Sequence, residues 1–434
     1  MQRKRFWVAL VLFSLIGQIA WVVENMYFNV FIYHMFHATQ AQIALMVQAS
    51  AVAATLTTLL IGALSDRLGK RKAFMTFGYI LWGVSILCFA AMRVDWIAKL
   101  FPAAAKDAAK AASIGVTLVI VFDCIMTFFG STANDACFNA WLTDSTDETN
   151  RGKAEGLNAM MPLLAILVVF GGTMWAKNDS AEHWTILFLA IGTIVLVSGV
   201  LGLFLIDEPK DLKPQKDGYF YTLFYGFRPR VIRENPNLYL TLLGFTVFGI
   251  SIQVFMPYLI LYYTEALHLD NYVLIMAPAI VLAAIATALY GRLYDRIGYR
   301  RSLVPALVVL LCGYAVLYLF RSTALVFLGS LLMMCGYLCG MAVYGARIRD
   351  CTPKAMAGRF QGLRIIAQVL IPGVIGPEIG KLVLRGAEQF TNSDGTTSFI
   401  PNANIYLWAG VVLLFVGAIT AIELIRAGKE NAHA

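Results

Sequence analysis

Charged residues are scarce in this chain: Asp, Glu, Lys and Arg make up 14% of its 434 residues, and hydrophobic residues make up 59%. Soluble globular domains carry about 25% charged residues, so the composition excludes an ordinary soluble protein. The apolar residues gather in runs of about 20, the length that crosses a bilayer as a helix. Twelve such runs lie at 6–33, 41–64, 73–92, 113–141, 156–176, 184–206, 238–263, 273–291, 302–320, 324–346, 360–384 and 404–425.

Residues for covalent or metal chemistry are few as well. The five histidines lie in the expected outer loops or in the tail, and the seven cysteines show neither zinc-site spacing nor a disulfide framework. We find no Ser/His/Asp set, phosphate loop or metal cluster. The sequence therefore predicts neither an enzyme nor a protein with a cofactor or a metal site.

The net charge of +8 could suggest a nucleic-acid partner, but its distribution does not. Lys and Arg occur in every second loop between the apolar runs, about 25 on one side against about 8 on the other. This asymmetry predicts a multi-pass protein, with both termini in the cytoplasm, in a bacterial cytoplasmic membrane. Its partner is then the lipid bilayer and not a nucleic acid.

The chain repeats itself. The stretch GALSDRLGKRKAF (62–74) returns as GRLYDRIGYRRSL (291–303), a shift of 291 − 62 = 229 residues. LTDSTDETNRGKAEGLN (142–158) aligns without gaps on IRDCTPKAMAGRFQGLR (348–364), a shift of 348 − 142 = 206. Two such parallel halves are typical of transporters whose substrate binds between them, near the middle of the membrane.

The repeat predicts the domain organisation. We expect a six-helix bundle at 1–206, a cytoplasmic linker rich in charge and Pro at 207–237, and a second six-helix bundle at 238–434.

The repeated loop G-x-L-x-D-R-x-G-x-R-[KR] resembles the loop motif of the major facilitator superfamily. With twelve spans in two halves, the resemblance covers essentially the whole chain. It implies an all-α membrane protein of 12 transmembrane helices in two bundles, which works by alternating access. In that family the Asp and Arg of the loop hold helices together on the cytoplasmic side, a role that the resemblance assigns to Asp66, Arg67, Asp295 and Arg296.

Polar residues inside a span are costly and are therefore candidates for function. At 100° per residue, Gln18, Trp21 and Asn25 lie on one face of the first span, and Glu24 flanks that face. Amides, a carboxyl group and an indole ring suit a hydroxylated ligand. The alternative for the amides is hydrogen bonding between packed helices.

The fourth span carries two acids, Asp123 and Asp135, on a broad polar face with Asn139. Either acid could take up a proton or bind a cation. The alternative for Asp135 is an ion pair with a nearby Arg.

The stretch DACFNAWL (135–142), followed by Asp144, resembles the fourth-span motif of the glycoside–pentoside–hexuronide:cation symporters, the melibiose-permease group. The resemblance implies sugar binding at Asp135 and Asn139, and cation coupling at Glu24. Cys137 stands where that group usually has Pro, and the second span carries no acid. We therefore expect the coupling ion to be a proton, with sodium as the alternative.

The second half offers fewer charged candidates. Residues expected to line the cavity there are Gln253, Tyr258 and Tyr262 in the seventh span, Tyr344 in the tenth, and Arg364 and Gln368 in the eleventh. Arg364 aligns with Asn158, so this half alone gained a cation at that position. The alternative for Arg364 is a side chain that extends to the cytoplasmic surface.

The sequence thus favours a secondary transporter that moves a sugar or glycoside together with a proton and is monomeric. The alternative on the same fold is an exporter or flippase of lipophilic compounds or lipids. An exporter would more often carry a Gly-rich G-P motif in the fifth span, and this fifth span lacks it.

Overall fold

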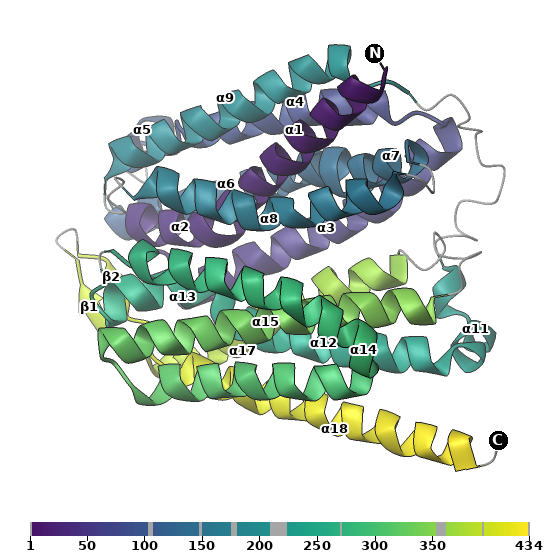
Figure 1. Ribbon diagram of the computed structural model, residues 1–434. Helices are drawn as coiled ribbons and strands as arrows, with labels where there is room; N and C mark the ends of the chain where they lie inside the picture. Colours follow the sequence, from purple (N-terminus) through teal and green to yellow (C-terminus); the bar gives the residue numbers. More distant parts are fainter. Residues whose placement is uncertain are drawn as a thin grey trace. The chain divides into compact units, whose positions relative to one another are not determined.

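The computed structural model describes residues 2–102, 107–146, 150–174, 180–208, 224–269, 271–352, 362–392 and 395–432 (Figure 1). Within these residues, 12 helices are long and apolar enough to cross a membrane. The prediction of an all-α protein with twelve transmembrane helices is confirmed. These spans are Lys4–Phe36, Gln40–Leu68, Lys72–Phe89, Ala108–Asp144, Lys153–Thr173, Ala181–Leu205, Pro236–Ala266, Val273–Tyr299, Arg301–Leu319, Thr323–Cys351, Gly362–Gly386 and Asn404–Ile422.

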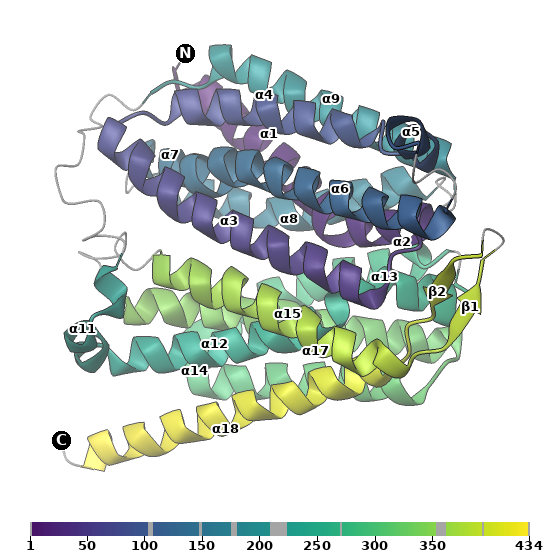
Figure 2. The ribbon, with the colours of Figure 1, turned by 180° about the vertical axis from the view of Figure 1, so that it is seen from behind.

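The chain forms two compact units, Met1–Tyr219 with Gln389–Phe399, and Phe220–Glu388 with Ile400–Ala434. Residues 209–223 of the expected linker lie outside the described residues. The first unit contains α1 (Gln2–Val22), α2 (Phe28–Phe36), α3 (Gln40–Leu68), α4 (Lys72–Phe89), α5 (Val94–Leu100), α6 (Ala108–Gly130), α7 (Asn139–Asp144), α8 (Arg151–Thr173) and α9 (Ala181–Leu205). Within it, α3 lies beside α6 (Figure 2).

An antiparallel hairpin of β1 (Gln389–Thr391) and β2 (Thr397–Phe399) also belongs to the first unit, with Gln389 opposite Phe399. The sequence places this segment in the second half, between the last two spans. It groups with the first unit because the Tyr33 hydroxyl, at the end of the first span, donates a 2.6 Å hydrogen bond to the Phe399 carbonyl oxygen.

The second unit has the same number of spans. Its helices are α11 (Pro229–Glu234), α12 (Pro236–Phe255), α13 (Leu259–Leu261), α14 (Val273–Leu319), α15 (Thr323–Cys351), α17 (Ile371–Val383) and α18 (Asn404–Ala432). Short 3-10 turns lie at Tyr225–Phe227, Met256–Tyr258 and Leu384–Gly386. The long α14 comprises two spans, because the backbone at Gly298 is not helical.

The two copies of the repeated loop share one backbone feature. Gly69 ends α3 with φ 62° and ψ 33°, and its N–H bonds back to the Asp66 and Ser65 carbonyl oxygens. Gly298, its mate at the 229-residue shift, has φ 76°. Only Gly adopts positive φ without steric cost, so the backbone turn explains why both copies keep a Gly at this point.

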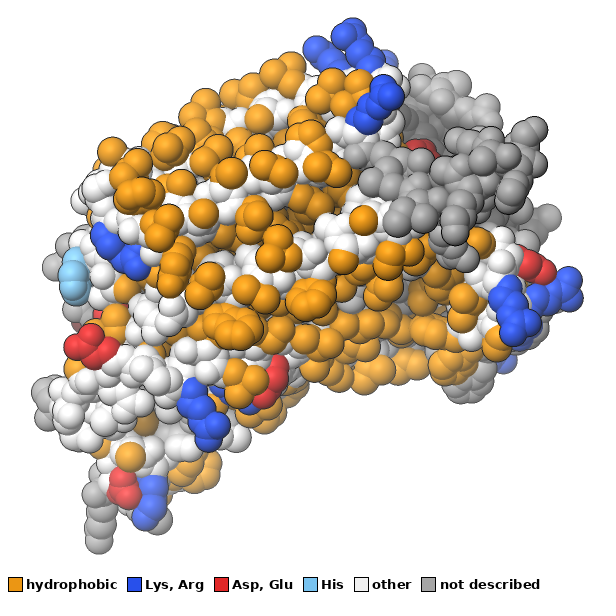
Figure 3. All heavy atoms as spheres, turned by 90° about the horizontal axis from the view of Figure 1, so that it is seen from below, with side chains coloured by type: hydrophobic (Ala, Val, Ile, Leu, Met, Phe, Trp, Pro, Cys, Tyr) orange, Lys and Arg blue, Asp and Glu red, His pale blue; other side chains and the backbone are white. Residues whose placement is uncertain are grey.

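Glycine also allows close approach of the spans in each unit. A Cβ on Gly83 of α4 would lie 2.4 Å from the Leu196 backbone nitrogen of α9, and one on Gly313 would lie 2.4 Å from the Met333 nitrogen. Small residues at such crossings let helices pack closely in lipid. Close packing matters there because burial of apolar surface gives little driving force for association, since the lipid tails are apolar too. Outside, hydrophobic side chains cover the central part of the face seen in Figure 3, and charged side chains lie at its margins.

We expect Gly83→Ala to lower the melting temperature of the purified protein, because overpacking against an immobile backbone costs about 1–3 kcal/mol. The matched control is Gly171→Ala in α8, where an added Cβ meets nothing within 4 Å. The control should melt at or slightly above the wild-type temperature, since Ala favours helix. Equal melting of the two variants would contradict the close approach of α4 and α9.

Candidate transport site

Two spans of the first unit change from α to π geometry in the middle. The π-helical segments are Val23–Tyr27 in the first span and Ser131–Phe138 in the fourth. A π turn inserts an extra residue and commonly marks a functional position. These segments carry Glu24 and Asp135, two of the acids that the sequence singled out.

Glu24 is buried, with 6% of its surface exposed, between three spans. Its Oε1 accepts hydrogen bonds from the Ser50 hydroxyl of α3 at 2.7 Å and from the Thr127 hydroxyl of α6 at 2.8 Å. The two hydroxyl oxygens lie 2.9 Å apart. The other carboxyl oxygen, Oε2, is buried without a hydrogen-bond partner among the described residues.

Asp123 is the second buried acid, 1% exposed and one helical turn before Thr127 on α6. Its Oδ1 also has no hydrogen-bond partner in the described part of the chain. None of the ion pairs formed between described residues involves Glu24 or Asp123. The first unit therefore holds two buried carboxyl groups that no described Lys or Arg neutralises.

Asp135 differs from these two acids because its side chain is only half-buried. The Ser131 hydroxyl donates to its Oδ2 at 3.0 Å. One turn further, Asn139 is exposed, and its amide donates to the Asp135 carbonyl oxygen at 3.1 Å. No ion pair with an Arg is found for Asp135 among the described residues, so its interaction partners there are neutral.

Trp21 connects the first span to the fourth. Its indole N–H donates to Asn134 Oδ1 at 3.3 Å, and the Asn134 amide donates to the Tyr79 hydroxyl at 2.8 Å. Tyr79 in turn donates to the Phe13 carbonyl oxygen at 2.7 Å. A Cβ on Gly17 would lie only 2.2 Å from the Asn134 amide nitrogen, so the two spans touch closely here.

The remaining candidates of the first span are polar groups away from the core. Asn25 is exposed, and its amide donates to the Trp21 carbonyl oxygen at 2.8 Å. Gln18 is half-buried. Exposed amides would be unfavourable against lipid, so this side of the unit is suited to a wet cavity or a polar ligand.

The second unit arranges its candidates differently from the expected cavity lining. Tyr258, Tyr262 and Tyr344 are fully buried. Tyr344 packs against the Phe245 ring, with centroids 5.3 Å apart, and Tyr262 packs against Tyr406 at 5.2 Å. Two breaks interrupt the seventh span at these residues. The 3-10 turn Met256–Tyr258 and the π segment Tyr262–Ala266 change the register of its later residues.

Three polar candidates of the second unit are half-buried: Gln253, Arg364 and Gln368. Gln253 packs against the eleventh span, because a Cβ on Gly376 would lie 2.3 Å from the Gln253 Cβ. Gln368 lies in a π-helical segment, Ile366–Leu370. A substrate contact by any of the second-unit candidates remains a prediction.

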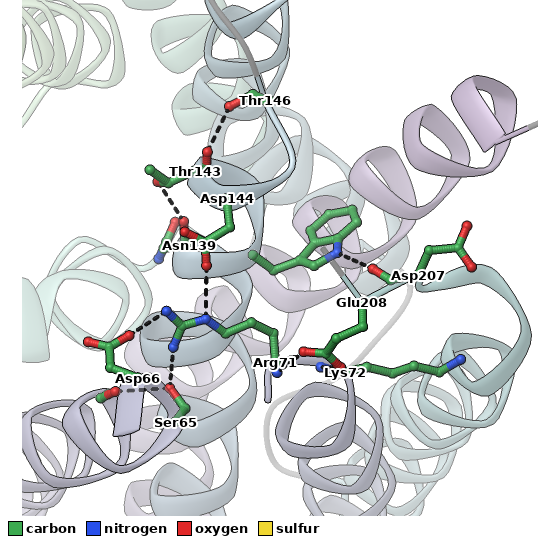
Figure 4. Close-up of polar contacts among 12 residues, drawn as sticks. Ser65, Asp66, Arg71, Lys72, Asn139, Thr143, Asp144, Thr146, Asp207 and Glu208 are labelled. Atoms are coloured by element: carbon green, nitrogen blue, oxygen red, sulfur yellow. Dashed lines mark hydrogen bonds and ion pairs between the residues drawn. The ribbon is translucent and has the colours of Figure 1, made fainter. Parts of the chain in front are cut away.

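A network of charges joins the ends of four spans around Arg71 (Figure 4). Its guanidinium donates to Asp66, to the Ser65 hydroxyl at 2.5 Å, and to Asp144 Oδ2 at 3.0 Å. The Glu208 carboxylate accepts from the backbone N–H groups of Arg71 and Lys72, at the start of α4. An acid at a helix N-terminus is favourable, because the terminal N–H groups carry partial positive charge.

Arg71 is the centre of this network, with 7% of its side chain exposed. Burial alone lowers the pKa of a guanidinium, but Asp66 and Asp144 more than offset it, and the pKa of Arg71 is raised. The Arg71 guanidinium therefore keeps its positive charge across the physiological pH range.

Of the four loop residues predicted to hold the helices together, only Asp66 forms an ion pair with a described residue. Asp66 takes part as expected, but its partner is Arg71, whereas Arg67 is exposed and forms no ion pair with a described residue. Arg67 immediately follows Asp66 on the same helix and is therefore about 100° further around the helix axis. The chain turns at Gly69, and Arg71 after this turn contacts Asp66. In the second copy, Asp295 and Arg296 are exposed.

Comparison with known proteins assigns the family. A family model described as the Major Facilitator Superfamily matches residues 6–377, most of the chain. The chain belongs to the major facilitator superfamily. It is thus a multi-pass membrane transporter of this superfamily and not an enzyme in the usual sense. No curated protein matches the sequence itself.

Solved structures of the superfamily share the fold at low identity. A mutant of the nucleoside transporter NupG is 12% identical, with a TM-score of 0.71, over 95% of this chain and 98% of that one. An inward-facing bacterial homolog of the human lysosomal transporter Spinster is 14% identical, with a TM-score of 0.70, over 97% and 96%. The xylose transporter XylE from E. coli is 14% identical, with a TM-score of 0.66, over 94% and 97%. The likeness to the melibiose-permease group is not among these findings.

Sequence reasoning missed several residues that form hydrogen bonds to the candidate residues of this facilitator, among them Ser50 and Tyr79. They were missed because Ser50 carries no charge and because Tyr79 lies in a third span that is otherwise mostly apolar. The fixed spacing of Asp66, Gly69 and Arg71 in the repeated loop was the available signal for the Arg71 network. The repeat retains an Arg at the same point, Arg300.

We expect Asp66→Asn to loosen the Arg71 network, because a hydrogen bond between two charged groups contributes about 1.5–3 kcal/mol. Cys137 is a native reporter, since it is fully buried on the π segment that packs against α3. With the other cysteines replaced, N-ethylmaleimide should label Cys137 about tenfold faster or more in Asp66→Asn, as each 1.4 kcal/mol is a factor of ten. Arg67→Gln is the matched control and should label at the wild-type rate. Equal rates in both variants would contradict the role of Asp66.

Proposed function

We propose that this facilitator is a secondary active transporter that moves a sugar or glycoside by alternating access, in symport with a proton. The carrying observation is the Glu24 carboxyl group, which is buried between three spans with two hydroxyl donors and no cation from the described part of the chain. Burial disfavours the charged form of a carboxyl group that lacks a counter-charge. Such a group is suited to taking up and releasing a proton during transport.

The hydrogen count around Glu24 supports protonation. Three oxygens, Glu24 Oε1, Ser50 Oγ and Thr127 Oγ1, make three mutual contacts of 2.7, 2.8 and 2.9 Å. The two hydroxyl groups supply only two hydrogens. When both hydroxyl groups donate to Oε1, their own 2.9 Å contact has no hydrogen. With a third hydrogen on the carboxyl group, Oε1 donates to one hydroxyl group and accepts from the other, so that every oxygen of the ring donates once and accepts once.

Asp123 supplies a second acceptor near this ring, since it lies one turn from Thr127 and its Oδ1 is unbonded within the described chain. Two close, buried carboxyl groups cannot both ionise cheaply. We assign Glu24 as the coupling acid, because it carries the hydroxyl contacts, and Asp123 as its partner. Sodium at the same oxygens is the alternative ion, but it would replace the hydrogen bonds with coordination.

The sugar is assigned to the polar side of the first and fourth spans. Asp135 and Asn139 offer acceptors and donors for hydroxyl groups, and Trp21 offers a ring face for a sugar's C–H groups. Among the solved structures, one is named a xylose transporter and another a nucleoside transporter, and a nucleoside is a glycoside of ribose. An export pathway for lipophilic compounds, the other candidate, would gain nothing from exposed amides and a carboxyl group.

In the proposed cycle, sugar binds beside the protonated acid, and the loaded transporter reorients. Proton release from Glu24 then breaks this ring, because both hydroxyl groups donate to the carboxylate and no hydrogen is left for the contact between Ser50 and Thr127. The first, second and fourth spans are joined at this point, so the protonation state reaches three helices directly.

We expect Glu24→Gln to retain exchange of labelled sugar across proteoliposome membranes but to abolish accumulation driven by a pH gradient. The amide mimics the neutral acid and keeps an acceptor for Ser50 and Thr127, yet it cannot release a proton. Glu182→Gln, at the exposed start of α9, removes one carboxylate elsewhere and should leave both activities unchanged.

The contradicting results are separate for the two parts of the proposal. Full accumulation by Glu24→Gln would remove Glu24 from coupling. Wild-type accumulation that follows a sodium gradient and ignores the pH gradient would replace the proton by sodium. Absence of transport for every sugar or glycoside in a labelled panel would reject the substrate class.

A further inference from the structure

We propose that residues 224–234, just before the seventh span, bind the headgroup region of anionic phospholipids. This stretch, called the juxtamembrane segment below, contains the 3-10 turn Tyr225–Phe227 and the short helix α11. It belongs entirely to the second unit. The proposal depends neither on the substrate nor on the coupling ion.

The juxtamembrane segment is folded back against the start of the seventh span. The Tyr239 hydroxyl, in the first turn of α12, donates a hydrogen bond to the Gly226 carbonyl oxygen. α11 lies against the start of α12 (Figure 1), and Val231 of α11 is buried. Gly226 is therefore held within the length of one tyrosine side chain of the first turn of the span.

The length of the seventh span places that first turn in the headgroup region. The hydrocarbon core of a bilayer takes about 20 helical residues, whereas the span Pro236–Ala266 has 31. The residues in excess extend beyond the core at the ends of the span. Tyr239, the fourth residue, is then at the interface between lipid and water, and the segment that it holds lies at the same level.

Two aromatic rings of the juxtamembrane segment are exposed together. Phe224 is 55% exposed and Phe227 is 43% exposed, and their ring centroids lie 6.4 Å apart. Ile232 of α11 is exposed as well. Apolar side chains of this kind are unfavourable in water but bury their surface in the boundary between headgroups and acyl chains.

The charges of the segment select the kind of lipid. Arg228, Arg230 and Arg233 face a single acid, Glu234, which gives 3 − 1 = +2. Arg228 lies over the Tyr225 ring, 5.9 Å from its centroid. Arg230 Nε donates to Glu234 Oε1 at 2.8 Å, but 88% of the Arg230 side chain is exposed. Such an exposed pair contributes little, so it does not prevent Arg230 from binding a phosphate.

An anionic lipid fits this combination better than the other possible occupants. The guanidinium fork matches phosphate oxygens, and the neighbouring rings match the start of an acyl chain. A soluble anion would use the arginines and leave the rings in water. A second copy of the segment would bring the same net positive charge, which repels.

The test measures amide hydrogen exchange of the full chain in nanodiscs that hold one protein each. The lipid is phosphatidylcholine alone, or phosphatidylcholine with phosphatidylglycerol, and mass spectrometry follows peptides that cover residues 224–234. The exchange is expected to respond to lipid, because a helix as short as α11 is marginal by itself. One protein per disc removes the second copy from the experiment.

Three double variants separate charge from apolar contact. Arg230→Gln with Arg233→Gln removes two exposed cations, and Phe224→Ala with Phe227→Ala removes the exposed rings. The matched control is Arg292→Gln with Arg301→Gln, which removes two exposed cations elsewhere in the same unit.

We expect phosphatidylglycerol to slow exchange in the wild-type segment about fivefold or more, the effect of one arginine near an anionic surface. The double Arg variant should lose this slowing. The double Phe variant should exchange faster than the wild type in both lipids, because it lacks the apolar contact. The control pair should respond to phosphatidylglycerol as the wild type does.

Three results would overturn the proposal. Equal exchange of the wild-type segment in the two lipids would reject binding of anionic lipid. Slowing of the wild-type size in the double Arg variant would assign the effect to other cations. The same slowing by inorganic phosphate in pure phosphatidylcholine would replace the lipid by a soluble anion.

Discussion

The hydrogen bonds to the Glu24 carboxyl group are the interaction on which the candidate site depends. They join the first, second and fourth spans through one acid and two hydroxyl groups, in a region that contains no balancing cation within the described residues. Two π-helical segments accompany this arrangement, one at Glu24 and one at Asp135. A buried acid in such a setting links protonation to the packing of helices, and this link is what coupled transport requires.

The two halves of the chain use one sequence repeat for different purposes. The loop after the second span is fixed by Arg71 and three acids, whereas its copy after the eighth span leaves Asp295 exposed. Both copies keep a Gly with positive φ, Gly69 and Gly298, although the ψ angles differ, at 33° and 172°. The repeat therefore keeps the Gly that a positive φ requires, while the turn itself and the side-chain contacts differ between the two copies.

Much of the fold was predictable, because span length and the internal repeat depend on local sequence and on the thickness of the bilayer. Glu24 could also be found from sequence, since an acid in an apolar run is conspicuous. Its partners could not, because Ser50 and Thr127 meet it only when three helices pack. Arg67 was expected in place of Arg71 for the same reason. The buried positions of Tyr258 and Tyr262 depend on helix breaks that a regular helical spacing does not represent.

The most direct test of the account is to count protons when sugar binds. Purified wild-type protein in weakly buffered detergent solution receives saturating sugar, and a pH indicator follows the free proton concentration. The account predicts uptake of about one proton per protein in the pH range where Glu24 is partly ionised, and none in Glu24→Gln, which should still bind the sugar. The same uptake in both proteins would contradict it, because the proton would then reside on another group.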